Sequence, residues 1–81
     1  MTELREKRQI LDAAGFVYEF YHEVYVNRKE KKIISLDFIE DHTAAELQKR
    51  IRQETDGRTW QFHFNNQPAN SVRHQLETAL G

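Results

Sequence analysis

The 81-residue sequence predicts a small α+β domain whose elements follow the order α-β-β-β-α-β-α. Three β-rich runs, Phe16–Tyr21, Val24–Arg28 and Ile33–Ile39, are separated only by short polar breaks, which is typical of an antiparallel meander. Helical periodicity precedes and follows this meander, and a strictly alternating run occupies Arg58–Asn65. We expect a mostly antiparallel sheet of three to four strands with helices packed on it, forming one domain over residues 1–81.

The helices are placed by their periodicity and by their end signals. The first is predicted over residues 2–14 and ends at Gly15, a residue that suits the left-handed position after a helix. The second begins at Thr43, because Thr43 and Glu46 have the spacing of a capping box, and it closes at Gly57. A last helix begins at Asn70 or Ser71.

Alternation along the strands predicts one core face of the sheet. Its expected members are Phe16, Tyr18, Phe20, Val24, Val26, Ile34, Leu36, Phe38, Trp60, Phe62 and Phe64. The pairing of the fourth strand stays open. It either adds at an edge of the meander or pairs with the same strand of a second copy.

Composition narrows the classes of function. The chain has no cysteine, so a disulfide, a thiolate zinc site and a cysteine nucleophile are excluded. No apolar run approaches the roughly 18 residues of a membrane span, and we expect a cytoplasmic protein without membrane contact. The sequence carries no P-loop, dinucleotide or HExxH motif, so we expect no enzyme activity, no catalytic residues and no cofactor.

A cluster of cations marks the second break of the meander. Arg28, Lys29, Lys31 and Lys32 are candidate phosphate contacts, since a cationic hairpin tip can bind nucleic acid. A hairpin tip is also where lysine keeps a sheet soluble and discourages edge pairing. The net charge of −1 lacks the basic excess that is typical of dedicated nucleic-acid binders.

A polar strip and four histidines form a second group of candidates. Gln61, His63 and Asn65 share one face of the fourth strand and could hydrogen-bond a peptide or a carbohydrate, although any solvent-facing strand displays such residues. The histidines lie too far apart in sequence to match a helical metal motif, and we expect no metal site.

An apolar group opposite the expected core face is the third candidate. Val17, Tyr21, Tyr25 and Ile33 would be exposed there if helices covered only one face of the sheet, and tyrosine is enriched at protein interfaces. The alternative is that the first or last helix covers this second face within the monomer.

The sequence resembles two groups of known proteins. The segments Asn27–Lys32, Phe38–His42 and Gly57–Asn65 are similar to those of a family of small bacterial proteins without an assigned activity, so this resemblance implies no function. Residues 2–56 resemble double-stranded-RNA-binding domains in the order of their elements. That family has a lysine-rich entrance to its second helix, where this chain has Glu40-Asp41-His42-Thr43.

The sequence therefore favours a non-enzymatic module that binds protein, either a partner or a second copy of itself, through the tyrosine face or a sheet edge. Nucleic-acid binding through the basic turn is the alternative hypothesis.

Overall fold

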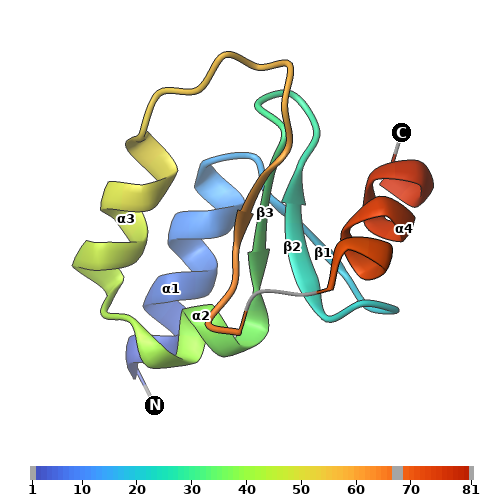
Figure 1. Cartoon of the computed structure of the whole chain (residues 1–81). Helices are drawn as coiled ribbons and strands as arrows, with labels where there is room; N and C mark the ends of the chain where they lie inside the picture. The colour runs from blue at the N-terminus through green and yellow to red at the C-terminus, as the bar shows by residue number, and fades with distance from the viewer. Residues whose placement is uncertain (1, 67–68, 81) are drawn as a thin grey trace.

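The computed structural model describes residues 2–66 and 69–80 and confirms the predicted α+β class (Figure 1). The chain forms a mixed sheet with helices on both of its sides. In chain order the elements are α1 (Thr2–Ala13), β1 (Val17–Glu19), β2 (Val24–Asn27), β3 (Lys32–Ser35), α2 (Leu36–Asp41), α3 (Ala44–Arg52), β4 (Gln61–His63) and α4 (Asn70–Leu80).

The sheet has the strand order β1-β2-β3-β4. The first three strands form the predicted antiparallel meander, with Tyr18 opposite Tyr25 and Tyr25 opposite Ile34. β4 adds at the edge of this meander and runs parallel to β3. A parallel neighbour needs a long crossover connection, which α2 and α3 supply here. The two edge strands of the described sheet are therefore β1 and β4.

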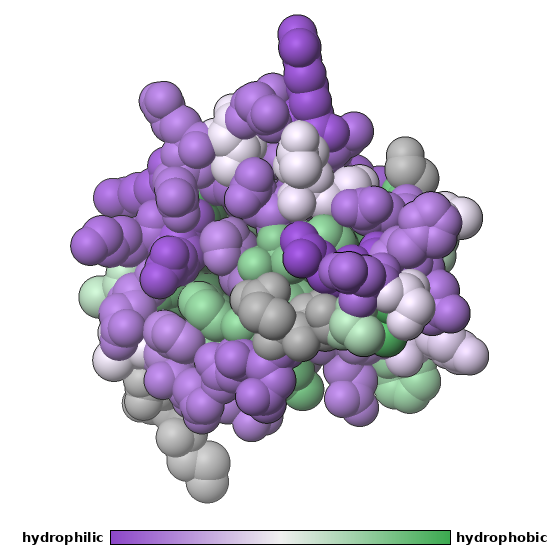
Figure 2. Space-filling model, viewed as in Figure 1, coloured by the Kyte–Doolittle hydropathy of each residue, from purple (hydrophilic) through white to green (hydrophobic). Residues whose placement is uncertain are grey.

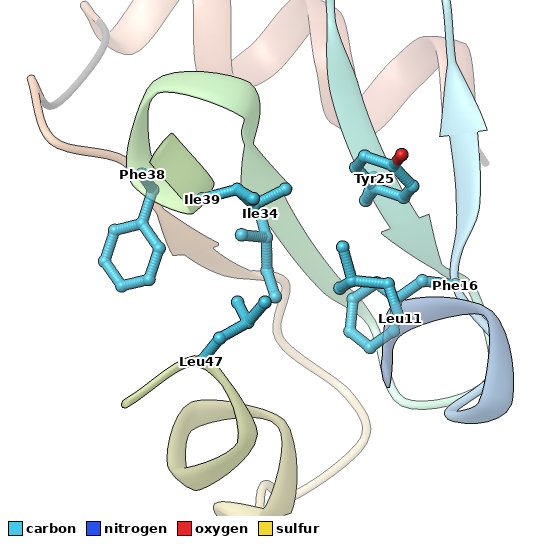
Figure 3. Packing of buried hydrophobic residues seen from close by; sticks show 7 residues of the cluster. All are labelled: Leu11, Phe16, Tyr25, Ile34, Phe38, Ile39 and Leu47. Carbon is cyan, nitrogen blue, oxygen red and sulfur yellow. The ribbon is translucent and has the colours of Figure 1, made fainter. Parts of the chain in front are cut away.

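Both faces of the sheet are covered, so the expectation of a single core face was wrong. On one face, Tyr25 and Ile34 pack with residues of α1, α2 and α3 around Leu11 and Leu47 (Figure 3). On the other face, α4 covers a second cluster (Figure 1). Its buried members are Val24, Val26, Ile33, Trp60, Leu76 and Leu80. The alternation of residues between the two faces was predicted correctly within the second and third strands. The prediction that Val24 and Val26 share a face with Ile34 was wrong, because they lie on the opposite face of the sheet.

The predicted third strand stops early, because Ser35 begins a helix. The Ser35 hydroxyl accepts a hydrogen bond from the Phe38 N–H at 3.3 Å, as an N-cap does. Phe38 and Ile39 are buried residues of this helix, α2. The alternation of Ile34, Leu36 and Phe38 was therefore misinterpreted as strand beyond Ser35.

Two other helix boundaries follow local signals. The capping box of α3 is confirmed, since Thr43 and Glu46 each accept a hydrogen bond from the backbone N–H of the other. α3 ends at Arg52, several residues before the predicted Gly57. Gly15 follows α1 with a φ of 91°, a left-handed conformation that favours glycine.

Two buried lysines hold the ends of helices. The Lys32 side chain is only 2 % exposed, and its ammonium donates to the carbonyl oxygens of Ile51 at 2.6 Å and Gln53 at 2.7 Å. These carbonyls lie at the C-terminus of α3, where a cation also meets the negative end of the helix dipole. Lys7 on α1 donates in the same way to the Ile39 carbonyl of α2 at 2.8 Å.

Replacement of the Lys32 ammonium should therefore destabilise the fold. We expect Lys32→Met, which keeps the apolar stem, to lower the free energy of unfolding by about 2–3 kcal/mol, because buried carbonyls lose charged hydrogen bonds. Urea-induced unfolding measures the change. Lys29→Met, at an exposed cation of the same turn, is the matched control and should stay within about 0.5 kcal/mol of the parent. Equal stability of the two variants would contradict this role of Lys32.

Candidate functional site

We call Arg28, Lys29, Lys31 and Lys32 the basic turn. Three of these four side chains donate hydrogen bonds to backbone carbonyls elsewhere in the fold. Arg28 Nε donates to the Leu80 carbonyl at the end of α4 at 3.3 Å, and Lys31 Nζ donates to the Arg58 carbonyl at 3.3 Å. Lys32 is buried against the end of α3, so the prediction that it contacts phosphate was wrong. The reason is that backbone carbonyls of three later segments converge on this turn. Lys29 is exposed beside them.

The four residues of the predicted interface do not share an exposed face. Val17 and Tyr21 are 63 % and 84 % exposed, whereas Tyr25 and Ile33 are 5 % and 0 % exposed. Tyr25 belongs to the cluster that α1, α2 and α3 cover, and Ile33 belongs to the cluster that α4 covers. The expectation of exposure was wrong for these two residues, because helices cover both faces of the central strands.

An exposed apolar surface does exist, but it follows the edge strand β1 and the turn after it. Val17 and Tyr18 lie in β1, and Phe20 and Tyr21 lie in the following turn. Tyr18 is 39 % exposed and Phe20 is 83 % exposed, although both were expected in the core. We call these four residues the β1 surface. In the structure β1 ends at Glu19 and the turn begins at Phe20, which removes Phe20 from the alternation that the sequence suggested.

The turn that carries Phe20 and Tyr21 is held by its own hydrogen bonds. The Glu19 carboxylate accepts from the backbone N–H groups of Tyr21 at 3.0 Å and His22 at 2.7 Å, and it contacts His22 Nδ1 at 2.6 Å. Desolvation alone would raise the pKa of Glu19, but these bonds lower the pKa below its ordinary value. Glu23 has a φ of 55°, and its carbonyl accepts from the Leu36 N–H at 3.1 Å. The turn is thereby joined to the start of α2.

A cavity of about 270 Å³ lies beside this surface. Its walls are formed by Leu4 and Arg8 of α1, Tyr18 and Tyr25 of the sheet, and Leu36, Ile39 and Glu40 of α2. We call it the α1–α2 pocket. The rings of Tyr18 and Tyr25 lie 5.0 Å apart at its inner wall. Arg8 and Glu40 are the two charged residues of a lining that is otherwise aliphatic and aromatic.

Tyr25 contributes both a ring and a hydroxyl to the residues that line this pocket. The residue is 5 % exposed, and no buried polar side-chain atom among the described residues lacks a hydrogen-bond partner, so its hydroxyl is not a buried unsatisfied group. The pocket therefore combines apolar walls with a few hydrogen-bonding groups, which is the composition of a ligand site.

The polar strip of β4 contacts the rest of the fold. His63 is half-buried with its ring 5.9 Å from that of Phe38, and Asn65 Nδ2 donates to the Asp37 carbonyl at 3.2 Å and to the Asp41 carboxylate. Burial lowers the pKa of His63, and the nearby charges of Arg50 and Lys32 lower it further.

Within residues 2–66 and 69–80 no three histidine or acidic side chains come close enough to hold a metal ion.

Figure 2 shows that the face of the molecule in the view of Figure 1 is mostly hydrophilic, with hydrophobic residues visible only in patches. None of the helices in the described part of the chain combines the length and the apolar character that crossing a membrane requires.

Comparison with known protein families, curated proteins and solved structures finds no match for this chain. The candidate site is therefore defined by the geometry of the β1 surface and the α1–α2 pocket.

The lowered pKa of His63 predicts a contribution to the pH dependence of stability. The unfolded chain takes up a proton near pH 6.5, whereas the folded chain does so only at lower pH. The unfolded state then binds more protons, so the free energy of unfolding falls as the pH drops through 6.5 toward the folded pKa. We expect His63→Gln to flatten this decline in urea-unfolding experiments between about pH 7.5 and 5.

His74→Gln, on the exposed side of α4, is the matched control for this experiment. A decline as steep in His63→Gln as in the parent protein would show that His63 does not cause it.

Proposed function

We propose that this protein is a non-enzymatic module that binds protein through the β1 surface and the free edge of β1. The observation that carries this proposal is the succession of four exposed apolar residues along an edge strand and its turn. Exposed apolar residues that stand singly are normal on a protein surface, whereas a group of them along one strand and its turn is a candidate interaction site.

The size of the β1 surface is appropriate for the centre of an interface. A tyrosine or phenylalanine buries about 150–250 Å², so Phe20 and Tyr21, each more than four-fifths exposed, offer roughly 250–400 Å² between them. A standard interface buries about 800 Å² per partner. Val17, Tyr18 and the surrounding polar rim would supply the remainder.

The backbone of β1 supports the same conclusion. β1 pairs with β2 on one side, and no described strand lies on its other side. An unpaired edge offers backbone N–H and C=O groups to an added strand. Proteins commonly protect such edges with lysine or proline, but the residues of β1 are Val17, Tyr18 and Glu19. The other edge strand, β4, presents half-buried side chains.

The positions of the histidines favour binding over catalysis. His22 contacts the Glu19 carboxylate, His42 Nδ1 bonds the Phe38 carbonyl at 2.9 Å, and His63 packs near Phe38. Each of these side chains is thus engaged in holding a turn or a helix. General acid–base chemistry needs a titratable group directed at a substrate.

Nucleic-acid binding is the weaker alternative, because three of the four cations in the basic turn bond to backbone carbonyls. A titration of labelled protein with short duplex DNA, followed by amide NMR at low and moderate salt, tests it. We expect no salt-dependent shifts confined to residues 27–33. A binding constant falling with salt at a slope of about −0.9 per phosphate contact would favour the alternative.

The β1 surface should be necessary for association but not for folding. We expect the double variant Phe20→Ser/Tyr21→Ser to lose association with protein, whether measured as self-association by sedimentation or as capture of a partner from cell extract. Its free energy of unfolding should change by no more than about 0.5 kcal/mol per substitution, since both side chains are exposed.

Val72→Ser is the control for this variant, because Val72 is an exposed apolar residue on α4, outside the β1 surface. Association that survives in the double variant, or that is lost equally in Val72→Ser, would refute the assignment of the binding surface.

A further inference from the structure

We infer that the α1–α2 pocket is the receptor site for Tyr21 of a second copy of this chain. This inference rests on the proposed function and names the partner that the β1 surface binds. In a two-fold pair, each copy would insert its Tyr21 into the pocket of the other.

The pocket has the size of an aromatic side chain. Its volume is about 270 Å³, whereas an apolar cavity of roughly 150 Å³ is sufficient to bind benzene. Leu4, Leu36, Ile39 and the tyrosine rings supply apolar walls for a ring. Leu4 is 48 % exposed and lies at the rim, where an entering side chain would cover it.

The polar groups of the pocket favour a ring with a hydroxyl at its tip. The Arg8 guanidinium and the Glu40 carboxylate, both on exposed residues, line the pocket together with Tyr25. A phenol can donate one hydrogen bond and accept another. It could therefore pair with the Tyr25 hydroxyl, accept from the Arg8 guanidinium or donate to the Glu40 carboxylate. A phenylalanine ring would displace water from these groups without replacing its hydrogen bonds, so Tyr21 fits the pocket better than Phe20.

Tyr21 is presented for insertion on a fixed turn. The residue is 84 % exposed, and its backbone N–H donates to the Glu19 carboxylate. A side chain on a preorganised turn loses less conformational entropy on binding than one on a mobile loop.

The location of Tyr21 and the pocket on one surface points to a second copy as the occupant. The turn is joined to the pocket wall by the bond from the Leu36 N–H to the Glu23 carbonyl, and both lie at the same end of the sheet (Figure 1). A two-fold interface must be self-complementary, with residue i of one copy meeting residue j of the other and the reverse. One patch that carries both an exposed tyrosine and a pocket for a tyrosine satisfies this condition.

The test compares the self-association of the full chain with that of two variants. Sedimentation velocity over a range of concentrations gives the dissociation constant of the dimer. Tyr21→Ala removes the inserted side chain, and Leu4→Trp fills the pocket from its rim. We expect each variant to raise the dissociation constant about tenfold or more, which corresponds to about 1.4 kcal/mol.

Mixing the two variants gives the decisive result. A Leu4→Trp chain keeps Tyr21, and a Tyr21→Ala chain keeps an open pocket, so a mixed dimer retains one of the two contacts. We expect the mixture, with one variant fluorescently labelled, to associate more tightly than either variant alone and less tightly than the parent. A general loss of structure would not produce this recovery. Tyr25→Phe should weaken the parent dimer while urea unfolding stays close to that of the parent.

Three outcomes would overturn the inference: a parent chain that is monomeric up to millimolar concentration, a dimer indifferent to Tyr21→Ala or Leu4→Trp, and a mixture no tighter than its components. The proposed function fails separately. If the parent is monomeric but Phe20→Ser/Tyr21→Ser abolishes capture of another protein, only the self-association is refuted. If no association depends on the β1 surface, both proposals are refuted.

Discussion

The bond between the buried Lys32 ammonium and the end of α3 is the interaction on which the rest of this small fold depends. Lys32 belongs to β3, and its carbonyl partners belong to the chain that leads from α3 to β4. The contact therefore sets where the crossover returns to the sheet. Arg28 and Lys31 extend the same arrangement to α4 and to the segment before β4. A chain of 81 residues without cysteine has no disulfide to perform this task.

This use of the basic turn changes the functional interpretation of the molecule. Side chains that could have contacted phosphate bind backbone carbonyls instead, and helices cover both faces of the central strands. The three most exposed large apolar residues, Val17, Phe20 and Tyr21, lie in β1 and its turn. The binding surface that we propose therefore lies at the sheet edge, where coverage by helices ends, and not on a sheet face.

The proposed contact between two copies also bears on stability. A domain of this size buries only about 60–65 % of the surface that its unfolded chain exposes. Its free energy of unfolding is therefore expected to be small. Anything that binds only the folded state adds to the free energy of unfolding by mass action. Insertion of Tyr21 into the α1–α2 pocket would bury an aromatic ring. Stability and association would then rise together with protein concentration.

The sequence by itself determined the order of the elements, the α+β class, the capping box of α3 and the glycine that ends α1, because these depend on residues close together in the chain. It also identified Val17 and Tyr21 as candidate interface residues, but Tyr25 and Ile33 proved buried. Alternation separates the two faces of a strand without showing which one a helix will cover. The N-cap at Ser35 is a local bond from the Phe38 N–H, but the alternation of Ile34, Leu36 and Phe38 was interpreted as strand. The tertiary structure decided the coverage of the two faces and the partners of the cations, since both depend on segments distant in sequence.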